Sequence, residues 1–427
     1  MVEADQVSDP VGSTVVLTAS FGFFLAGCAL LVVKGASLAT IHAFAAFIVL
    51  AIVAASHQLI PVLTRAPTSR PQAVIAISVP LIAGFGLLIT GFLSSSAFLA
   101  PGGLTLLGGI VAWVLWTLSR LVLGRLESET RALVALCALA FLVAGSIGAA
   151  MAFSLEGILS RDAIRLAPIH ALCAIVLFAS VLIATVSRRL VPMFALAHSR
   201  ETLWGRSVPW LVVVGGTAAA LGVFYASAPA LRAGFVLLIG AALFGTRSLG
   251  DTLRQRLRRR LDISLQYAVA AWAFAVLSAT LAVAGMWWNP LTTAATACAI
   301  LGWVSLSIVG YAYKISGFLA WQWAKSRSGD GPLPALASAI PIGPARTALA
   351  LLSIGTLGIG ASLAGEASFS QIAFATYAAG GYTAAGVVVS VALKYVKGAV
   401  WRSNPRAPKC SASTRGGCGR PSRWSEY

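Results

Sequence analysis

Three stretches of this 427-residue chain share one pattern: ATIHAFAAFIVLAIVAASHQLIPVL at 39–63, HALCAIVLFASVLIATVSRRLVPMF at 170–194 and ATACAILGWVSLSIVGYAYKISGFL at 295–319. Each is a long apolar segment that ends in a polar pair, two apolar or small residues, and a Pro or Gly. The anchor residues Pro61, Pro192 and Gly317 are 131 and 125 residues apart. Repetition at a nearly constant spacing is typical of chains built from copies of one structural unit. The sequence therefore predicts three copies.

The composition predicts a polytopic membrane protein. Hydrophobic residues make up 58% of the chain, charged residues only 10%, and the mean hydropathy is +0.87. Apolar segments of roughly 20 residues are long enough to cross a bilayer as helices. We expect 12 such helices, at 13–34, 38–63, 73–97, 101–123, 131–153, 168–195, 208–228, 231–246, 265–287, 292–322, 343–364 and 369–395.

The expected fold is thus all-α, with a membrane domain over residues 1–400. Its 12 helices form three pseudo-repeats of four helices, over about 13–123, 131–246 and 265–395. The quoted pattern falls on helices 2, 6 and 10. Residues 401–427 are rich in Gly, Pro, Ser and Arg, and this composition is typical of a disordered basic tail.

The net charge of +18 is explained by membrane topology. With a cytoplasmic N-terminus, the inner loops and the tail hold 26 of the 31 Lys and Arg residues. This asymmetry obeys the positive-inside rule and predicts that both termini are cytoplasmic. The basic run at 254–260 is then a topology anchor facing the lipid bilayer, and we expect no nucleic-acid partner.

Two histidines are the candidate cofactor ligands. His42 lies 19 residues before Pro61 and His170 lies 22 before Pro192, which places both roughly 28–33 Å from the proline end of their helices. Imidazole is a common ligand for haem iron and copper. The alternative is that each histidine caps a helix or hydrogen-bonds a nearby carbonyl. None of the 13 Asp and Glu residues falls within a helix core, which weakens the case for a proton pump or proton-coupled carrier.

A three-ligand metal site is a further possibility. Counting back 19 residues from the other two anchors gives Cys173 and Cys298. If the helices are true copies, His42, Cys173 and Cys298 share one depth, and His with two thiolates is a known metal ligand set. The alternative is that both cysteines are small apolar core residues.

The polar pairs before the anchors have a simpler interpretation. They are His57-Gln58, Arg188-Arg189 and Tyr313-Lys314. Long cationic side chains near a helix end reach out to the lipid headgroups, so we expect these pairs to serve a structural role there. His198, in the polar loop after helix 6, is expected to be solvated.

Taken together, the three four-helix units and the histidine near the outer start of helix 2 resemble the catalytic subunit of the haem-copper oxidases. The segments HQLIPVL, RRLVPMF and YKISGFLAW are similar to those of uncharacterised bacterial membrane proteins related to that subunit. The resemblance implies a multi-pass protein of the bacterial cytoplasmic membrane. It also implies that His42 is a haem ligand and places His170 where the family has a copper ligand.

The resemblance breaks at the catalytic centre. The family needs six metal-binding histidines, and this chain has four. Helix 10 should supply ligands for both haems but carries Ala295 and Cys298, while helix 7 lacks its histidine pair. The sequence therefore predicts no oxygen or nitric oxide reduction and no copper site.

The expected function is a haem-binding or redox-associated membrane protein. Haem b would be held by His42 and secondly by His170, with a missing ligand from Cys298, Met286 or another subunit. Respiratory or redox subunits would then be its partners. The alternative is a non-redox transporter, or a structural subunit that keeps only the helical bundle.

Overall fold

The computed structural model describes residues 11–66, 69–197, 202–257, 260–328, 339–365 and 367–403, and within them it is all-α without a strand. It contains 12 helical segments long and apolar enough to cross a membrane, which confirms the predicted number. Ten of the spans consist of an α-helix, in one case with a short 3-10 turn before it: α1 (Val11–Lys34), α2 (Leu38–Thr64), α3 (Pro71–Leu93), α4 (Leu99–Leu123), α5 (Ser128–Leu155), α8 (Leu203–Phe224), α9 (Ala228–Arg254), α10 (Ile263–Ala284), α14 (Ile342–Ala364) and α15 (Ser370–Ser403).

The sixth and tenth spans are composite helices. The sixth consists of α6 (Ala167–Ala171), the π-helix η4 (Leu172–Ser180) and α7 (Val181–Ala195). The tenth consists of α11 (Pro290–Ala297), the π-helix η5 (Cys298–Val304) and α12 (Ser305–Ser328). The sequence predicted continuous α-helices here, so the two π-helices are a departure from that prediction.

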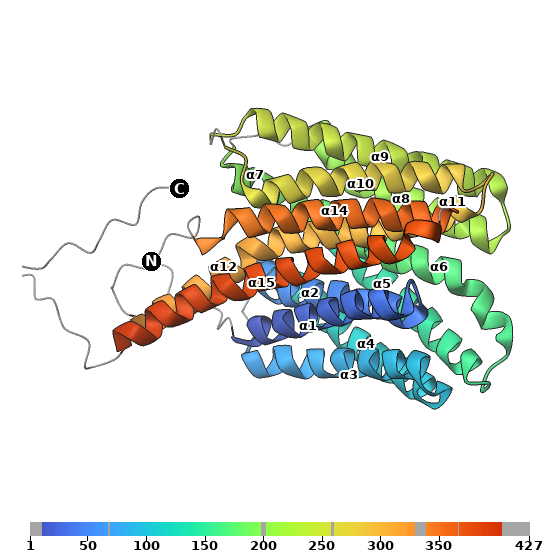
Figure 1. Cartoon of the computed structure of the whole chain (residues 1–427), viewed down its shortest axis with the longest axis horizontal. Helices are drawn as coiled ribbons and strands as arrows, with labels where there is room; N and C mark the ends of the chain where they lie inside the picture. The colour runs from blue at the N-terminus through green and yellow to red at the C-terminus, as the bar shows by residue number, and fades with distance from the viewer. Residues whose placement is uncertain are drawn as a thin grey trace, which may run out of the picture.

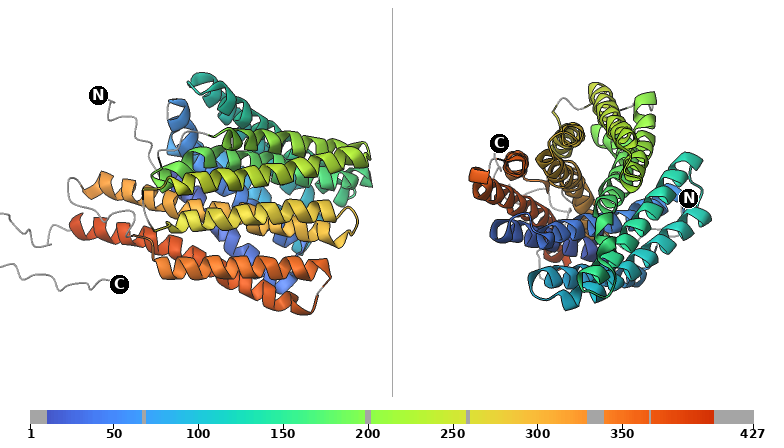
Figure 2. Two further views of the ribbon diagram at one scale, coloured as in Figure 1. Left: turned by 90° about the horizontal axis from the view of Figure 1, so that it is seen from above. Right: turned by 90° about the vertical axis from the view of Figure 1, so that its right-hand side faces the viewer.

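The helices form a closed bundle. Successive helices pack side by side along the chain, and α15 returns to contact α1. Figure 1 shows the helices running along one common direction, and in the end-on view of Figure 2 groups of helices radiate from a shared centre. The helix α15 continues to Ser403, slightly beyond the expected start of the tail. The predicted disorder of the remaining tail, including Cys410 and Cys418, concerns residues outside the described ranges.

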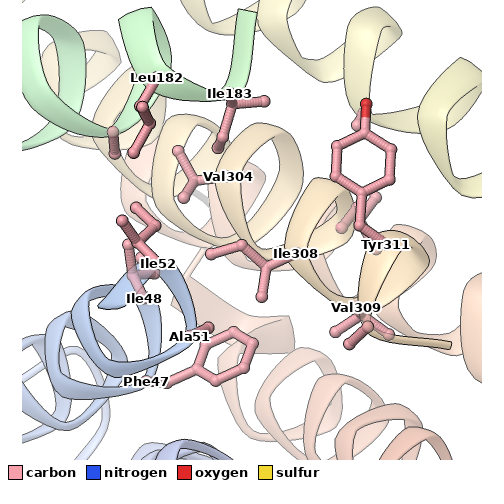
Figure 3. Close-up of a cluster of buried hydrophobic side chains, with 14 of the residues drawn as sticks. Phe47, Ile48, Ala51, Ile52, Leu182, Ile183, Val304, Ile308, Val309 and Tyr311 are labelled. Carbon is pink, nitrogen blue, oxygen red and sulfur yellow. The ribbon is translucent and has the colours of Figure 1, made fainter. Parts of the chain in front are cut away.

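The helices that carry the repeated pattern lie at the centre. Within an 18-residue apolar stretch of each span, 72% of residues are buried in α2, 50% in the sixth span and 78% in the tenth, against 22% in α9. α2 contacts both η4 and α12, and η4 contacts η5. Where they meet, the side chains are aliphatic or aromatic, including Ile52 of α2, Ile183 of α7 and Ile308 of α12 (Figure 3). We call this contact the central seam.

The outer surface of the bundle is apolar. Large aliphatic side chains such as Leu115 on α4, Leu139 on α5 and Val236 on α9 are more than half exposed. A soluble protein rarely exposes apolar surface so extensively, whereas lipid tails solvate it. The chain is a multi-pass membrane protein.

One polar contact recurs near the ends that carry Pro61, Pro192 and Gly317, which we call the proline end. In each case a residue of the polar pair binds the start of the preceding helix. Gln58 Nε2 donates to Ser13 Oγ at 2.9 Å, Arg188 Nη1 pairs with Glu129 Oε1 at 3.1 Å, and Lys314 Nζ pairs with Asp262 Oδ2 at 2.7 Å. Each contact holds a central helix to its neighbour.

These contacts correct the expectation that the polar pairs reach out to lipid headgroups. The Arg188 side chain is only 9% exposed, because it is held by Glu129. His57 is 2% exposed and its ring lies 4.0 Å from that of Trp116, and Tyr313 is fully buried against Tyr267. Only Arg189, with 63% of its side chain exposed, behaves as expected. His198 lies outside the described residues.

We predict that Asp262→Ala lowers the free energy of unfolding by roughly 2 kcal/mol, because it leaves the Lys314 ammonium without its carboxylate and removes the cap of α10. Asp262 Oδ1 accepts from the Ser264 amide at 3.0 Å, in addition to the Lys314 pair. Thermal unfolding in detergent measures the loss. The control Asp162→Ala removes a pair whose side chains are 77% and 85% exposed and should change little.

Candidate functional site

His42 lies in the first turns of α2, at the end of the bundle opposite the proline end, which we call the histidine end. Ser37 caps this helix by accepting a hydrogen bond from the Thr40 amide. The partly buried His42 ring lies 4.7 Å from the ring of Phe92 on α3. Its Nδ1 is 2.8 Å from the Leu38 carbonyl oxygen, one turn earlier in the same helix.

His170 lies in α6, and its ring faces α5. Its Nδ1 is 2.8 Å from the carbonyl oxygen of Ala144 on that helix. Gly148, one turn further along α5, makes room for the ring, since a Cβ built there would come within 2.9 Å of His170 Cε1. A larger residue at this position would displace the imidazole. The ring therefore packs against α5 at Ala144 and Gly148.

The two predicted histidines lie on different helices and contact different neighbours, His42 the ring of Phe92 on α3 and His170 the carbonyl of Ala144 on α5. A carbonyl oxygen can only accept a hydrogen bond, so Nδ1 of each ring carries a proton and donates it. In the neutral ring, Nε2 then presents its lone pair, and within the described residues neither Nε2 has a hydrogen-bond partner. Metal-bound histidines usually have this arrangement, with the second nitrogen held by a carbonyl or carboxylate.

The alternative interpretation was that each histidine caps a helix or hydrogen-bonds a nearby carbonyl. Each does bind a nearby carbonyl, as expected for a purely structural histidine. That contact involves only Nδ1, however, and it fixes the orientation of the ring without using Nε2. The geometry is compatible with both interpretations.

Cys173 and Cys298 occupy matching positions, because η5 begins at Cys298 and Cys173 is the second residue of η4. Both are buried free thiols. Cys298 Sγ faces α14, where it would lie 3.4 Å from a Cβ at Gly360. Among the described residues, no three His, Cys, Asp or Glu side chains are grouped to hold one metal ion. The structure therefore does not assemble His42, Cys173 and Cys298 into a common site.

The two π-helices have one feature in common. Ser180, the last residue of η4, donates its hydroxyl to the Ile175 carbonyl at 2.7 Å. Ser305, directly after η5, donates to the Ile300 carbonyl at 2.7 Å. Both bonds span five residues. In addition, Trp303 Nε1 donates to Ser180 Oγ at 2.9 Å, so a hydrogen bond joins the two π-helices directly.

A cavity of about 600 Å³ lies beside these π-helices. Its walls come from α6, η4, α7, α8, α9, α10, α11 and η5, and they include Ile175, Val176 and Trp303. π-Helical turns occur frequently at functional sites. Among the described lining residues there is no histidine or cysteine, and Met286 is the one with a sulfur atom. We call this space the histidine-end cavity.

Two further cavities lie towards the proline end. The central cavity, of about 460 Å³, lies between α2, α7 and α12 and touches Arg188 and Arg189. The proline-end cavity, of about 300 Å³, lies between α7, α8, α9 and α10 and touches the same two arginines.

The sequence did not indicate any of these cavities, because a cavity depends on how helices pack. The serines that end the π-helices were a readable signal, since they lie at the same distance before Pro192 and Gly317.

These features define a multi-pass α-helical membrane protein with 12 candidate spans. It has two imidazoles, each oriented by a backbone carbonyl, and a set of cavities around its central helices. No family model matches the sequence, and no curated protein matches it significantly.

We predict that Ser180→Ala lowers the free energy of unfolding by about 1–3 kcal/mol, because it leaves the buried Trp303 N–H without an acceptor. The emission of the Trp303 indole should change as well. Ser146→Ala is a matched control, since that hydroxyl lies on the exposed side of α5 and binds only the Leu142 carbonyl. Equal effects of the two substitutions would contradict a structural role for the link between the π-helices.

Proposed function

We propose that this protein is a haem-binding membrane protein of the haem-copper oxidase type that lacks a complete catalytic metal centre. The observation that carries the proposal is the matching geometry of two imidazoles, on the second and sixth spans, each with Nδ1 held by a carbonyl and Nε2 presented. A carbonyl partner on the second nitrogen is the usual way in which a protein orients a metal-binding histidine.

The proposed fold consists of three copies of one four-helix unit. The two π-helices support this, because they begin 20 residues before Pro192 and 19 before Gly317. The three polar contacts at the proline end also support it, because each joins the second helix of a unit to the first. The π-helices were not used to define the repeat in the sequence.

His42 and His170 are the residues that would hold haem b. When bound, a haem supplies one-electron redox chemistry, tuned by its axial ligands and surroundings. The carbonyls of Leu38 and Ala144 would keep both rings in the tautomer that can bind iron, and Gly148 leaves space for the His170 ring. Other redox subunits would exchange electrons with the protein.

The second candidate is a non-redox transporter. The observation that favours it is the adjacency of the cavities. The proline-end cavity shares Arg188 and Arg189 with the central cavity, and it shares Ala184 and Trp272 with the histidine-end cavity. Such linked cavities are a feature of proteins that move solutes through a helical bundle.

A haem spectrum separates the two candidates. We predict a b-type Soret band in protein purified after expression with ample haem, and its loss or shift in His42→Ala, because the axial ligand is removed. Gly148→Leu should also alter the band by displacing the His170 ring. His57→Ala is the control, since that buried histidine lies towards the proline end. Purified protein without haem would favour the transporter, whereas a band unchanged in His42→Ala would refute the ligand.

We further propose that the proline end faces the cytoplasm of a bacterial cell and that both termini lie there, because most Lys and Arg residues fall on that side. Single cysteines introduced into a cysteine-free variant test this orientation. Ser160→Cys, in the loop after α5, should react with a membrane-impermeant thiol reagent in intact cells. Gln255→Cys, after α9, should react only after lysis. The opposite labelling pattern would reverse the orientation.

A further inference from the structure

The ends of α2 and α4 meet at the proline end of the bundle. The Arg125 amide, just after α4, donates to the Thr64 carbonyl at the end of α2 at 2.6 Å. Gly124 makes this approach possible, since a Cβ there would clash with Thr64. Arg65, the C-cap of α2, follows Thr64 directly and has a left-handed backbone with φ 53°. Two arginines therefore flank one backbone contact between the helices.

A third arginine reaches the same junction from α5. Arg131 Nη2 donates to the Leu126 carbonyl at 3.3 Å and to the Gly124 carbonyl at 3.5 Å. Arg65, Arg125 and Arg131 are all exposed. We call these three residues the arginine corner.

The arginine corner forms no ion pair with a carboxylate among the described residues. The printed partners of Arg131 are uncharged carbonyls, and the side chains of Arg65 and Arg125 have no partner within the described ranges. Glu127, the acidic residue closest in sequence, is paired with Arg189 at 3.2 Å. A guanidinium group stays charged in a protein. The corner therefore keeps three positive charges.

The other two proposed units contain carboxylates where the first has none. The polar contact between the first two helices of a unit contains Glu129 in the second unit and Asp262 in the third. In the first unit, this contact joins two uncharged side chains. Leu196 takes the place of Arg65 in the second unit and caps α7 with the same left-handed backbone, at φ 50°. The cap therefore does not require an arginine, and the charge at this position is free for another role.

Exposed aliphatic side chains lie beside the arginine corner, on its bilayer side. Val62 is 71% exposed and lies one turn before Arg65, while Leu123 is 66% exposed and lies two residues before Arg125. In a membrane such side chains contact acyl chains, and guanidinium groups at a helix end lie at the level of the headgroups. A soluble anion would contact only the arginines, whereas a phospholipid would contact both surfaces.

We propose that the arginine corner binds the head of an anionic phospholipid, with the phosphate against the guanidinium groups and the acyl chains along Val62 and Leu123. Guanidinium groups bind phosphate oxygens through paired N–H donors. Three uncompensated cations favour a head with a net negative charge, such as that of phosphatidylglycerol, over a zwitterionic head that carries its own ammonium group. The site lies at the end opposite His42 and His170, so that binding does not depend on the proposed haem.

Native mass spectrometry of the purified full-length protein in detergent tests the proposal, because it resolves individual bound lipids. Dioleoylphosphatidylglycerol and dioleoylphosphatidylcholine are added separately, and the dissociation constant of the first bound lipid is measured. We expect phosphatidylglycerol to bind about tenfold more tightly, because its head has no cation of its own. Equal affinity for the two lipids would overturn the proposal. Ammonium phosphate, at an ionic strength matched with ammonium acetate, should not displace the lipid, and displacement would show a site for a soluble anion instead.

Variants of the arginine corner locate the site. The triple variant Arg65→Gln, Arg125→Gln and Arg131→Gln should weaken the first phosphatidylglycerol more than tenfold and leave phosphatidylcholine unchanged. The single variant Arg125→Gln, which keeps two of the charges, should weaken it roughly threefold. Lysine at all three positions keeps the charges and should recover most of the affinity. A lysine variant that binds no better than the glutamine variant would refute the role of charge.

A matched control removes the same charge elsewhere at the proline end. It carries three substitutions in the basic run after α9, namely Arg254→Gln, Arg256→Gln and Arg260→Gln. This control should bind the first phosphatidylglycerol as the wild type does. Equal losses in the control and in the glutamine variant of the arginine corner would show attraction by the net charge of the whole protein, and the proposed site would be wrong.

Discussion

The structure depends on the central seam, where α2, η4 with α7, and η5 with α12 pack against one another. Lipid tails are as apolar as leucine, so burial of aliphatic side chains gains little hydrophobic free energy inside a bilayer. Association there relies on close van der Waals packing and on interhelical hydrogen bonds. The seam supplies the packing through Ile52, Ile183 and Ile308. The contacts at the proline end supply polar bonds that hold each central helix to a neighbour.

The central cavity adjoins this seam, since Ile52, Ile183 and Ile308 also line it. The histidine-end cavity lies on the side where the π-helices are found. A π-helical turn contains more residues than an α-helical turn, and single such turns commonly reshape a helix locally. In the first copy of the pattern, Val49 takes the place of Ser180 and Ser305, and α2 is an uninterrupted α-helix there. The two copies that have the serine also have the π-helix, and the copy that lacks the serine lacks the π-helix.

Much of the architecture could be predicted from the sequence. Apolar length alone gives the number of spans, because in a membrane each helix must satisfy its own backbone hydrogen bonds. The separation of α8 from α9 was the least obvious division, and the structure places a break at Tyr225–Ser227. The sequence placed His42 and His170 at a similar depth, because they lie 19 and 22 residues before their anchors.

The partners of the polar side chains could not be predicted. From the sequence, Arg188 and His57 look like residues that reach out to the headgroups, because both lie near the end of a membrane helix. Sequence position gives the depth of a residue but not the direction of its side chain. Their burial depends on Glu129 and Trp116, which come from other helices. The same holds for Cys173 and Cys298, whose matching depth suggested a metal site. Equal depth on different helices does not bring side chains together unless they also face one another.

The sixth helix faces two different surroundings. Its His170 ring faces α5, while Ala171, Leu172 and Ile175 line the histidine-end cavity. One helix therefore separates the imidazole pair from the cavity. Under the proposed family resemblance, helices 6, 7 and 10 would enclose a catalytic metal centre, and these are the helices that contribute η4, α8 and η5 to the cavity wall. The space is present, but its described lining offers apolar surface in place of imidazoles.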